Sequence, residues 1–265
     1  MSDTPNRGIL HLVPNTLDSH TTGALPPIEA VLPLGVIRTA ARLEHWLVEN
    51  AKSARAFLKR IDAIESLVRP LQAISVIELP RPQKGAREAA PNFDAPRWLA
   101  PTLKGYDMGL LSEAGLPAVA DPGASAVEAA HALGVTVIAL PGPSALALAL
   151  AASGHNGQRF AFVGYLPTNE ASRAARIREL ESLSRRQQQT QLMIETPYRN
   201  AALLAALIQH LQGDTRLAVS CGLTLPGGWT RSERVAAWRS RPSQLPSDVP
   251  AVFSLDAGVA AAARN

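Results

Sequence analysis

Short apolar runs alternate with longer segments of helical periodicity along the chain. Ile9-Leu10-His11-Leu12-Val13 is an apolar run that Pro14 closes, as expected of a buried strand. Lys52 to Ile61 carries apolar residues at helical spacing with basic residues opposite, which predicts an amphipathic helix. Strands are also predicted at residues 73–77, 108–111 and 135–140, and helices at 123–133 and 144–153. Strands separated by helices are typical of a parallel α/β sheet.

A second α/β series follows the turn residues Gly154-His155-Asn156-Gly157. Here the pattern predicts strands at 160–163, 191–194, 217–220 and 251–255, and helices at 170–183 and 200–211. The residues around Gly227-Gly228-Trp229 predict a hairpin or loop. We therefore expect an α/β fold of two α/β domains, residues 1–156 and 157–265, with a ligand cleft between them.

Composition supports a folded chain with an aliphatic core. Hydrophobic residues make up 46% of the sequence and charged residues 18%, which is too little charge for a disordered chain. The formal net charge of +4 either favours an anionic partner or serves solubility alone.

Cysteine and histidine usage argues against two kinds of site. The single cysteine, Cys221, excludes an intrachain disulfide, and the six histidines lack metal-ligand spacing with carboxylates, so we expect no metal site. Residues 1–7 have no apolar signal core, and no apolar run reaches the roughly 18–20 residues of a membrane span. The sequence therefore predicts a soluble cytoplasmic protein.

Three loops follow predicted strands, where open α/β sheets bind their ligands. The first runs from Ser112 to Gly123. In it, Glu113 is either a site residue or a solvated carboxylate. Asp121, which precedes Pro122 and a predicted helix, either caps that helix or belongs to the site.

The other two loops also mix stiff turns with polar side chains. Leu140-Pro141-Gly142-Pro143-Ser144 is a stiff turn, and Ser144 either caps the next helix or binds a polar ligand. Glu195-Thr196-Pro197-Tyr198-Arg199 is either a substrate-facing cluster or a helix start with solvated Glu195 and Arg199. The chain has no G-x-G-x-x-G, P-loop or G-x-S-x-G motif, which argues against ordinary Rossmann, P-loop and serine-hydrolase sites.

Four segments in this order carry a family resemblance: SEAGLPAVADPG at 112–123, LPGPSA at 140–145, FAFVGYLP at 160–167 and IETPYRN at 194–200. Together they resemble the tetrapyrrole methylase superfamily of S-adenosylmethionine-dependent enzymes. Within it they are most similar to the branch of the small-subunit rRNA ribose 2'-O-methyltransferase. The resemblance runs from about Gly8 to Leu255 and implies two α/β domains, a cofactor cleft between them and a homodimer.

The resemblance also implies roles for particular residues. Methyl transfer is an in-line attack on a sulfonium methyl, so positioning is its main requirement. A ribose hydroxyl also needs a general base, for which the candidates are Glu113 and Glu195, with Arg199 as a phosphate or carboxylate contact. The residues implied to bind S-adenosylmethionine, several through their backbone, are Val13, Pro14, Gly115, Leu116, Val119, Ser144, Ala145, Met193, Ile194, Leu223 and Ala251.

Two segments depart from the family pattern. After the first strand the family usually has proline-isoleucine-glycine-asparagine, whereas this chain has Pro14-Asn15-Thr16-Leu17. The rRNA branch usually has glutamate-aspartate-threonine-arginine where this chain has Glu49-Asn50-Ala51-Lys52.

We therefore expect an S-adenosylmethionine-dependent methyltransferase that acts on RNA, at a ribose hydroxyl of rRNA. The basic segments 52–60, 81–87 and 173–186 either contact phosphates or form ordinary solvated surface. Two alternatives remain open: methylation of a tetrapyrrole or another small molecule, and a non-catalytic binding protein that retains the fold.

Overall fold

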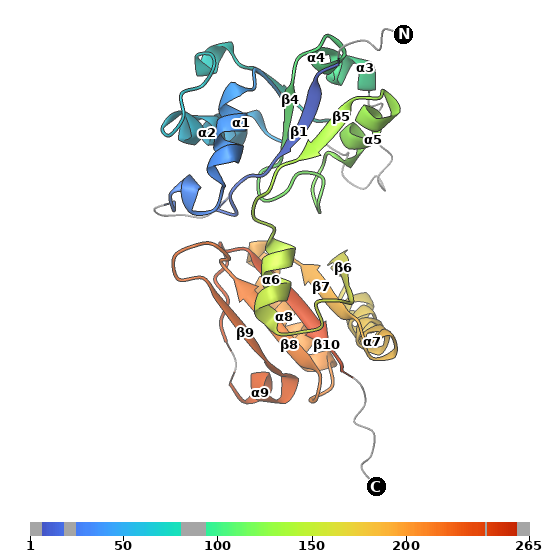
Figure 1. The fold of residues 1–265 in the computed structure, drawn as a ribbon. Helices are drawn as coiled ribbons and strands as arrows, with labels where there is room; N and C mark the ends of the chain where they lie inside the picture. The colour runs from blue at the N-terminus through green and yellow to red at the C-terminus, as the bar shows by residue number, and fades with distance from the viewer. Residues whose placement is uncertain (1–6, 19–24, 81–93, 242, 259–265) are drawn as a thin grey trace. The chain divides into compact units, whose positions relative to one another are not determined.

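The computed structural model describes residues 7–18, 25–80, 94–241 and 243–258. The chain divides into two compact units between Pro143 and Ser144. Each unit contains one five-stranded sheet with helices packed on it, which confirms the predicted α/β class (Figure 1). The basic segment 81–87 lies outside the described residues.

The first sheet is parallel throughout, with the spatial order β3-β2-β4-β1-β5. Its strands are β1 Ile9–Val13, β2 His45–Val48, β3 Ser75–Glu78, β4 Met108–Leu111 and β5 Thr136–Ala139. Apart from β2, all of these strands were predicted from the apolar runs. Because parallel strands end at the same edge of a sheet, the loops that follow β1, β2, β4 and β5 lie at one edge.

Helices cover both faces of this sheet because successive strand side chains point to opposite faces. Trp46 and Val48 share a core with α1 (Leu34–Arg42) and α2 (Ala51–Asp62). Leu47, between them, packs instead with α5 on the other side. The remaining elements of this unit are α3 Ala95–Trp98, α4 Ala100–Leu103, α5 Ala124–Ala132 and the short 3-10 helices η1 Ile28–Ala30 and η2 Leu71–Ala73.

The second sheet is mixed rather than parallel, with the order β6-β7-β10-β8-β9. Only β6 and β7 run parallel; β10 is antiparallel to both β7 and β8, and β8 and β9 form an antiparallel pair that confirms the predicted hairpin. The strands are β6 Phe160–Tyr165, β7 Thr190–Ile194, β8 Arg216–Cys221, β9 Trp229–Arg234 and β10 Ala251–Asp256.

The helices of the second unit again pack on both faces of its sheet. Met193 and Phe253 face the core under α7 (Glu170–Gln187), α8 and α9, whereas Leu192 and Val252 face α6. The bounds of the other helices are α6 Ala145–Ser153, α8 Asn200–His210, α9 Val235–Ser240 and the 3-10 helix η3 Pro197–Arg199.

Helix α6 belongs to the second unit. Its residues pack with strands of the second sheet, and Ser232 of β9 donates a hydrogen bond of 2.6 Å from its Oγ to the carbonyl oxygen of Ser153. The division therefore precedes α6, whereas the sequence placed it after the turn that follows this helix.

Candidate functional site

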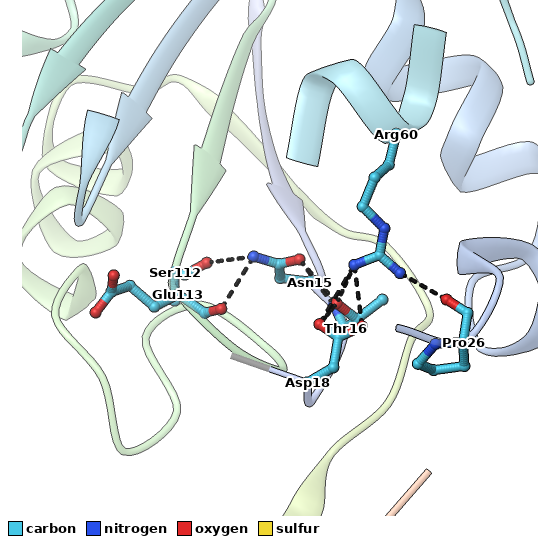
Figure 2. Close-up of polar contacts among 7 residues, drawn as sticks. All are labelled: Asn15, Thr16, Asp18, Pro26, Arg60, Ser112 and Glu113. Atoms are coloured by element: carbon cyan, nitrogen blue, oxygen red, sulfur yellow. Dashed lines mark hydrogen bonds and ion pairs between the residues drawn. The ribbon is translucent and has the colours of Figure 1, made fainter. Parts of the chain in front are cut away.

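The carboxyl edge of the first sheet joins loops that are far apart in the sequence. Asn15, after β1, donates from its amide Nδ2 to the carbonyl oxygens of Ser112 at 3.1 Å and Glu113 at 3.0 Å (Figure 2). Asn15 and Gly115 also exchange backbone hydrogen bonds of 2.9 and 3.2 Å. Asn15 is buried. It therefore fixes loop 112–115 against the end of β1.

Glu49 holds the same loop from the end of β2. Its Oε2 accepts a hydrogen bond of 3.0 Å from the backbone N–H of Glu113, while its own N–H donates to the carbonyl oxygen of Leu111 at 3.1 Å. The backbone of Glu113 is thus held from two sides. Its half-buried side chain points away from Asn15 (Figure 2).

Arg60 of α2 ties down the segment that follows β1. Its Nη1 lies 3.0 Å from Oδ2 of Asp18 and 3.1 Å from Oγ1 of Thr16, and its Nη2 donates to the carbonyl oxygen of Pro26 at 2.9 Å (Figure 2). Thr16 also donates to Asp18. Thr16 and Asp18 are buried, so these contacts of Arg60 hold the segment after β1 against α2.

Two glycines let three of these loops approach closely. Gly115 has a φ of +67°, a left-handed conformation that L side chains rarely adopt. A Cβ on Gly115 would lie a tight 3.3 Å from Cδ2 of Leu17, in the loop after β1, and in ordinary contact, 3.5 Å, with the carbonyl oxygen of Pro143. A Cβ on Gly142 would lie only 2.3 Å from Cβ of Pro14. The loops after β1, β4 and β5 are therefore packed together with little spare space.

The structure corrects the expectation that Asp121 caps a helix. Gly123 is the N-cap residue of α5, and no side chain caps this helix. Burial, together with the neighbouring carboxylates of Glu49 and Glu113, raises the pKa of Asp121 from 3.8 to about 7. Asp121 therefore lies near the carboxyls of Glu49 and Glu113, and its role in a site stays a prediction.

Replacing Asp121 with asparagine should stabilise the protein above neutral pH. The folded state binds the Asp121 proton more tightly than the unfolded chain, so wild-type stability falls as pH rises from 3.8 to about 7. After discounting for solvent screening, we expect a gain of about 1–2 kcal/mol at pH values above this window and none below it. Urea denaturation of both proteins, at pH values from below 3.8 to above 7, measures this difference in unfolding free energy.

Glu128→Gln on α5 is the matched control, because it removes the same charge from an exposed position. It should change the unfolding free energy by less than about 0.5 kcal/mol at every pH. A pH-independent effect of Asp121→Asn would contradict the assignment.

The loop after β7 in the second unit is built around a buried ion pair. Oε2 of Glu195 lies 2.8 Å from Nη2 of Arg199, and these side chains are 2% and 26% exposed. Oε1 of Glu195 accepts from the backbone N–H of Thr196 at 2.8 Å. The structure therefore brings Glu195 and Arg199 together and does not leave them solvated.

An apolar cluster lies on the α6 face of this sheet. Ala145, Ile194 and Leu223 pack there against the buried side chains of Leu150 and Val252. Three expected cofactor-binding residues thus share one apolar surface, the kind of wall that an adenine or a thioether needs.

The remaining expected cofactor residues have varied surroundings. Val13, Met193 and Ala251 are buried in helix-covered cores, so only their backbones can face a ligand. Ser144 caps α6 by accepting from the N–H of Ala147 at 3.4 Å, as one of its two interpretations held. Pro14 is buried, Leu116 is half-buried and Val119 is exposed.

The second departure from the family pattern has a structural role. Oδ1 of Asn50 accepts from the N–H groups of Lys52 at 2.9 Å and Ser53 at 3.3 Å, so Asn50 caps α2. Asparagine and aspartate cap helices about equally well. The start of α2 is therefore preserved despite the change.

The described residues contain no group of three or more His, Cys, Asp or Glu side chains placed to hold a metal ion. Among the same residues, no helix combines the length and the apolar character that a membrane crossing requires.

Sequence reasoning did not single out Asn15, Glu49 and Arg60 as site-building residues. A signal existed for Glu49, because the apolar run Trp46-Leu47-Val48 before it marks a strand end. Asn15 also follows a predicted strand and Arg60 lies in the basic segment 52–60, but their partners, which include Ser112 for Asn15 and Asp18 for Arg60, are distant in the sequence.

Loops gathered at the strand ends of one sheet, with glycines at close approaches, are typical of α/β proteins that bind a small ligand. The chain belongs to the tetrapyrrole methylase family: the family described as Tetrapyrrole (Corrin/Porphyrin) Methylases matches residues 36–235. This confirms the family that the four sequence segments predicted.

Curated relatives match part of the chain. A protein from Mesorhizobium japonicum named Ribosomal RNA small subunit methyltransferase I is 36% identical over 129 residues, 49% of this chain and 42% of the relative. A protein of the same name from Bacillus subtilis is 34% identical over 169 residues, 63% of this chain and 56% of the relative. The chain thus spans about half the length of these relatives.

Solved structures support the fold. The crystal structure of the methyltransferase CobJ matches with a TM-score of 0.54 at 16% identity, covering 94% of each chain. At this identity the likeness concerns the fold alone.

Proposed function

We propose that this protein is an S-adenosylmethionine-dependent methyltransferase that acts on RNA, at a ribose hydroxyl of rRNA. The observation that carries the proposal is the similarity to relatives named Ribosomal RNA small subunit methyltransferase I, at 34–36% identity in the two matches above. Membership of the tetrapyrrole methylase family supports the methyl-transfer chemistry.

The residues fit such a cofactor in two respects. The left-handed backbone at Gly115 and the close approach of Gly142 to Pro14 bring the loops of the first unit together without a side chain at either glycine. Ala145, Ile194 and Leu223 supply an apolar surface in the second unit. When bound, S-adenosylmethionine would supply an electrophilic methyl group, and each of these surfaces is a candidate contact for it.

We propose that the carboxyl groups near these loops accept the proton of the acceptor hydroxyl. Glu113 and Glu195 are the first candidates, and Asp121 joins them because a pKa of about 7 suits a general base near neutral pH. Arg199, which is held by Glu195, is our candidate contact for an anionic group of the acceptor.

We also propose a cytoplasmic homodimer with ribosomal RNA as its partner, in line with the family resemblance. The net charge of +4 suits an anionic partner. A tetrapyrrole carboxylate would suit the same charge, so the acceptor has to be tested directly.

Calorimetry with S-adenosylmethionine and its demethylated product, followed by a radiolabelled methyl assay, tests the proposal. We expect micromolar binding of both, and label on small ribosomal subunits but not on a free tetrapyrrole. The substitution that removes the base, Glu113→Gln, Glu195→Gln or Asp121→Asn, should lower turnover by about a hundredfold while cofactor binding is retained.

Label on the tetrapyrrole alone would replace the RNA acceptor with a macrocycle. The absence of cofactor binding would favour a non-catalytic protein that retains the fold, and the enzymatic proposal would be wrong.

A further inference from the structure

The two most exposed aromatic side chains of the described residues lie at one edge of the second sheet. Tyr198, in the 3-10 turn after β7, is 72% exposed, and Tyr165, the last residue of β6, is 58% exposed. β6 and β7 are adjacent parallel strands, and Tyr165 is in register with Ile194, the last residue of β7 (Figure 1). Tyr165 therefore ends β6 and Tyr198 comes shortly after β7, so both lie at the carboxyl ends of two neighbouring strands.

Hydrogen bonds and an ion pair of its neighbouring residues fix the turn that carries Tyr198. Arg199 donates its N–H to the carbonyl oxygen of Thr196 at 2.8 Å and pairs with the buried Glu195. Asn200, which is fully buried, donates from Nδ2 to the carbonyl oxygen of Val249 at 3.1 Å. Pro197 restricts the backbone directly before Tyr198.

An exposed aromatic ring on a fixed turn is suited to stacking. The ring's apolar faces gain by covering a flat partner, and little backbone entropy is lost because the turn is already fixed. Single-stranded RNA is recognised in this way, by unstacked bases that lie on aromatic side chains.

We propose that Tyr198, with Tyr165 at the same edge, is a stacking surface for an unstacked nucleobase of an RNA acceptor. This inference rests on the proposed function and deepens it. Arg199 next to it is our candidate contact for an anionic group, so the ring adds recognition of the face of a base to that charged contact. The preference for a base over an abasic strand therefore depends on the ring.

Fluorescence anisotropy with labelled single-stranded hexaribonucleotides tests the proposal on the full chain. The probes are oligoadenylate, oligouridylate and an abasic strand of the same length. We expect wild type to bind oligoadenylate most tightly and the abasic strand most weakly. Tyr198→Ala should weaken oligoadenylate binding by about five- to fifty-fold, down to the abasic level, and leave the salt dependence unchanged.

Two variants are the matched controls. Tyr198→Phe keeps the ring and should bind oligoadenylate within about twofold of wild type. Phe160→Ala removes an aromatic ring, 50% exposed, from the opposite end of β6, and should leave binding unchanged.

Several results would overturn the proposal. The first two are equal binding of the abasic and adenine strands by wild type, and no loss of oligoadenylate affinity in Tyr198→Ala. A shallower salt dependence in that variant would also contradict it. So would a changed sedimentation coefficient of the variant, which would place Tyr198 against a second copy of the chain. Calorimetry with S-adenosylmethionine separates the two proposals. If the cofactor fails to bind but the base preference depends on Tyr198, the nucleotide subsite stands and the proposed function falls.

Discussion

Replacing Gly142 with alanine should weaken S-adenosylmethionine binding by about a thousandfold, the affinity equivalent of about 4 kcal/mol. The new Cβ would lie 2.3 Å from Cβ and 2.4 Å from Cγ of Pro14. Both atoms belong to a rigid ring, so the loops after β1 and β5 must separate. That movement would also disturb the Asn15–Gly115 pairing that fixes loop 112–115. Calorimetry measures the loss.

Gly35→Ala is the matched control for this substitution. Gly35 is an exposed residue of α1, and a Cβ there would meet no atom within 4 Å. Cofactor affinity should be unchanged, and stability should rise by up to about 1 kcal/mol because alanine favours the helix. Unchanged affinity in Gly142→Ala would show that these loops do not bind the cofactor.

The largest stability effect should come from Trp46→Ala, with a loss of about 3–5 kcal/mol. Trp46 is fully buried, its ring centroid lies 6.2 Å from that of Phe57, and its Nε1 donates to the carbonyl oxygen of Leu43 at 3.1 Å. The ring also fills the space left by Gly109, where a Cβ would lie 2.6 Å from the indole. Because the interior is close-packed, we expect the surrounding side chains to fill the resulting cavity only in part.

Urea denaturation measures this loss, with Trp46→Phe as the graded comparison. Phenylalanine keeps part of the ring volume but leaves the carbonyl oxygen of Leu43 without its donor, so it should cost less than alanine. Equal costs for the two variants would mean that the hydrogen bond, and not packing, dominates at this position.

Local patterns were sufficient to predict most elements of both units. Apolar runs located β1 and β4 because parallel strands are buried on both faces and need continuous apolar sequence. The prediction missed β2, although Trp46-Leu47-Val48 is an apolar run there. It also missed α1, although Val36, Ile37, Ala40 and Ala41 form a helical face there.

The direction of the strands in the second sheet could not be predicted in the same way. β10 lies between β7 and β8 and runs antiparallel to both, and this placement depends on pairing between segments far apart in the chain. Apolar runs show that a strand exists but carry no information about its neighbours.

In the candidate site, too, local features could be predicted and long-range contacts could not. The loops that carry Glu113, Ser144 and Glu195 could be found from their positions after predicted strands. The amide of Asn15 reaches across 97 residues to Ser112, and such a contact is visible only once the sheet is formed. Sequence reasoning therefore locates the loops but not the bonds that hold them.

The central position of β10 has a consequence for biosynthesis. Its hydrogen-bonding partners β7 and β8 precede it in the chain, yet each leaves an edge open until residues 251–256 have emerged from the ribosome. During translation the second unit must wait with an incomplete sheet, whereas all five strands of the first unit lie before residue 140 and can pair much earlier. A nascent chain arrested shortly before β10 should therefore hold a protease-resistant first unit and a protease-sensitive second one.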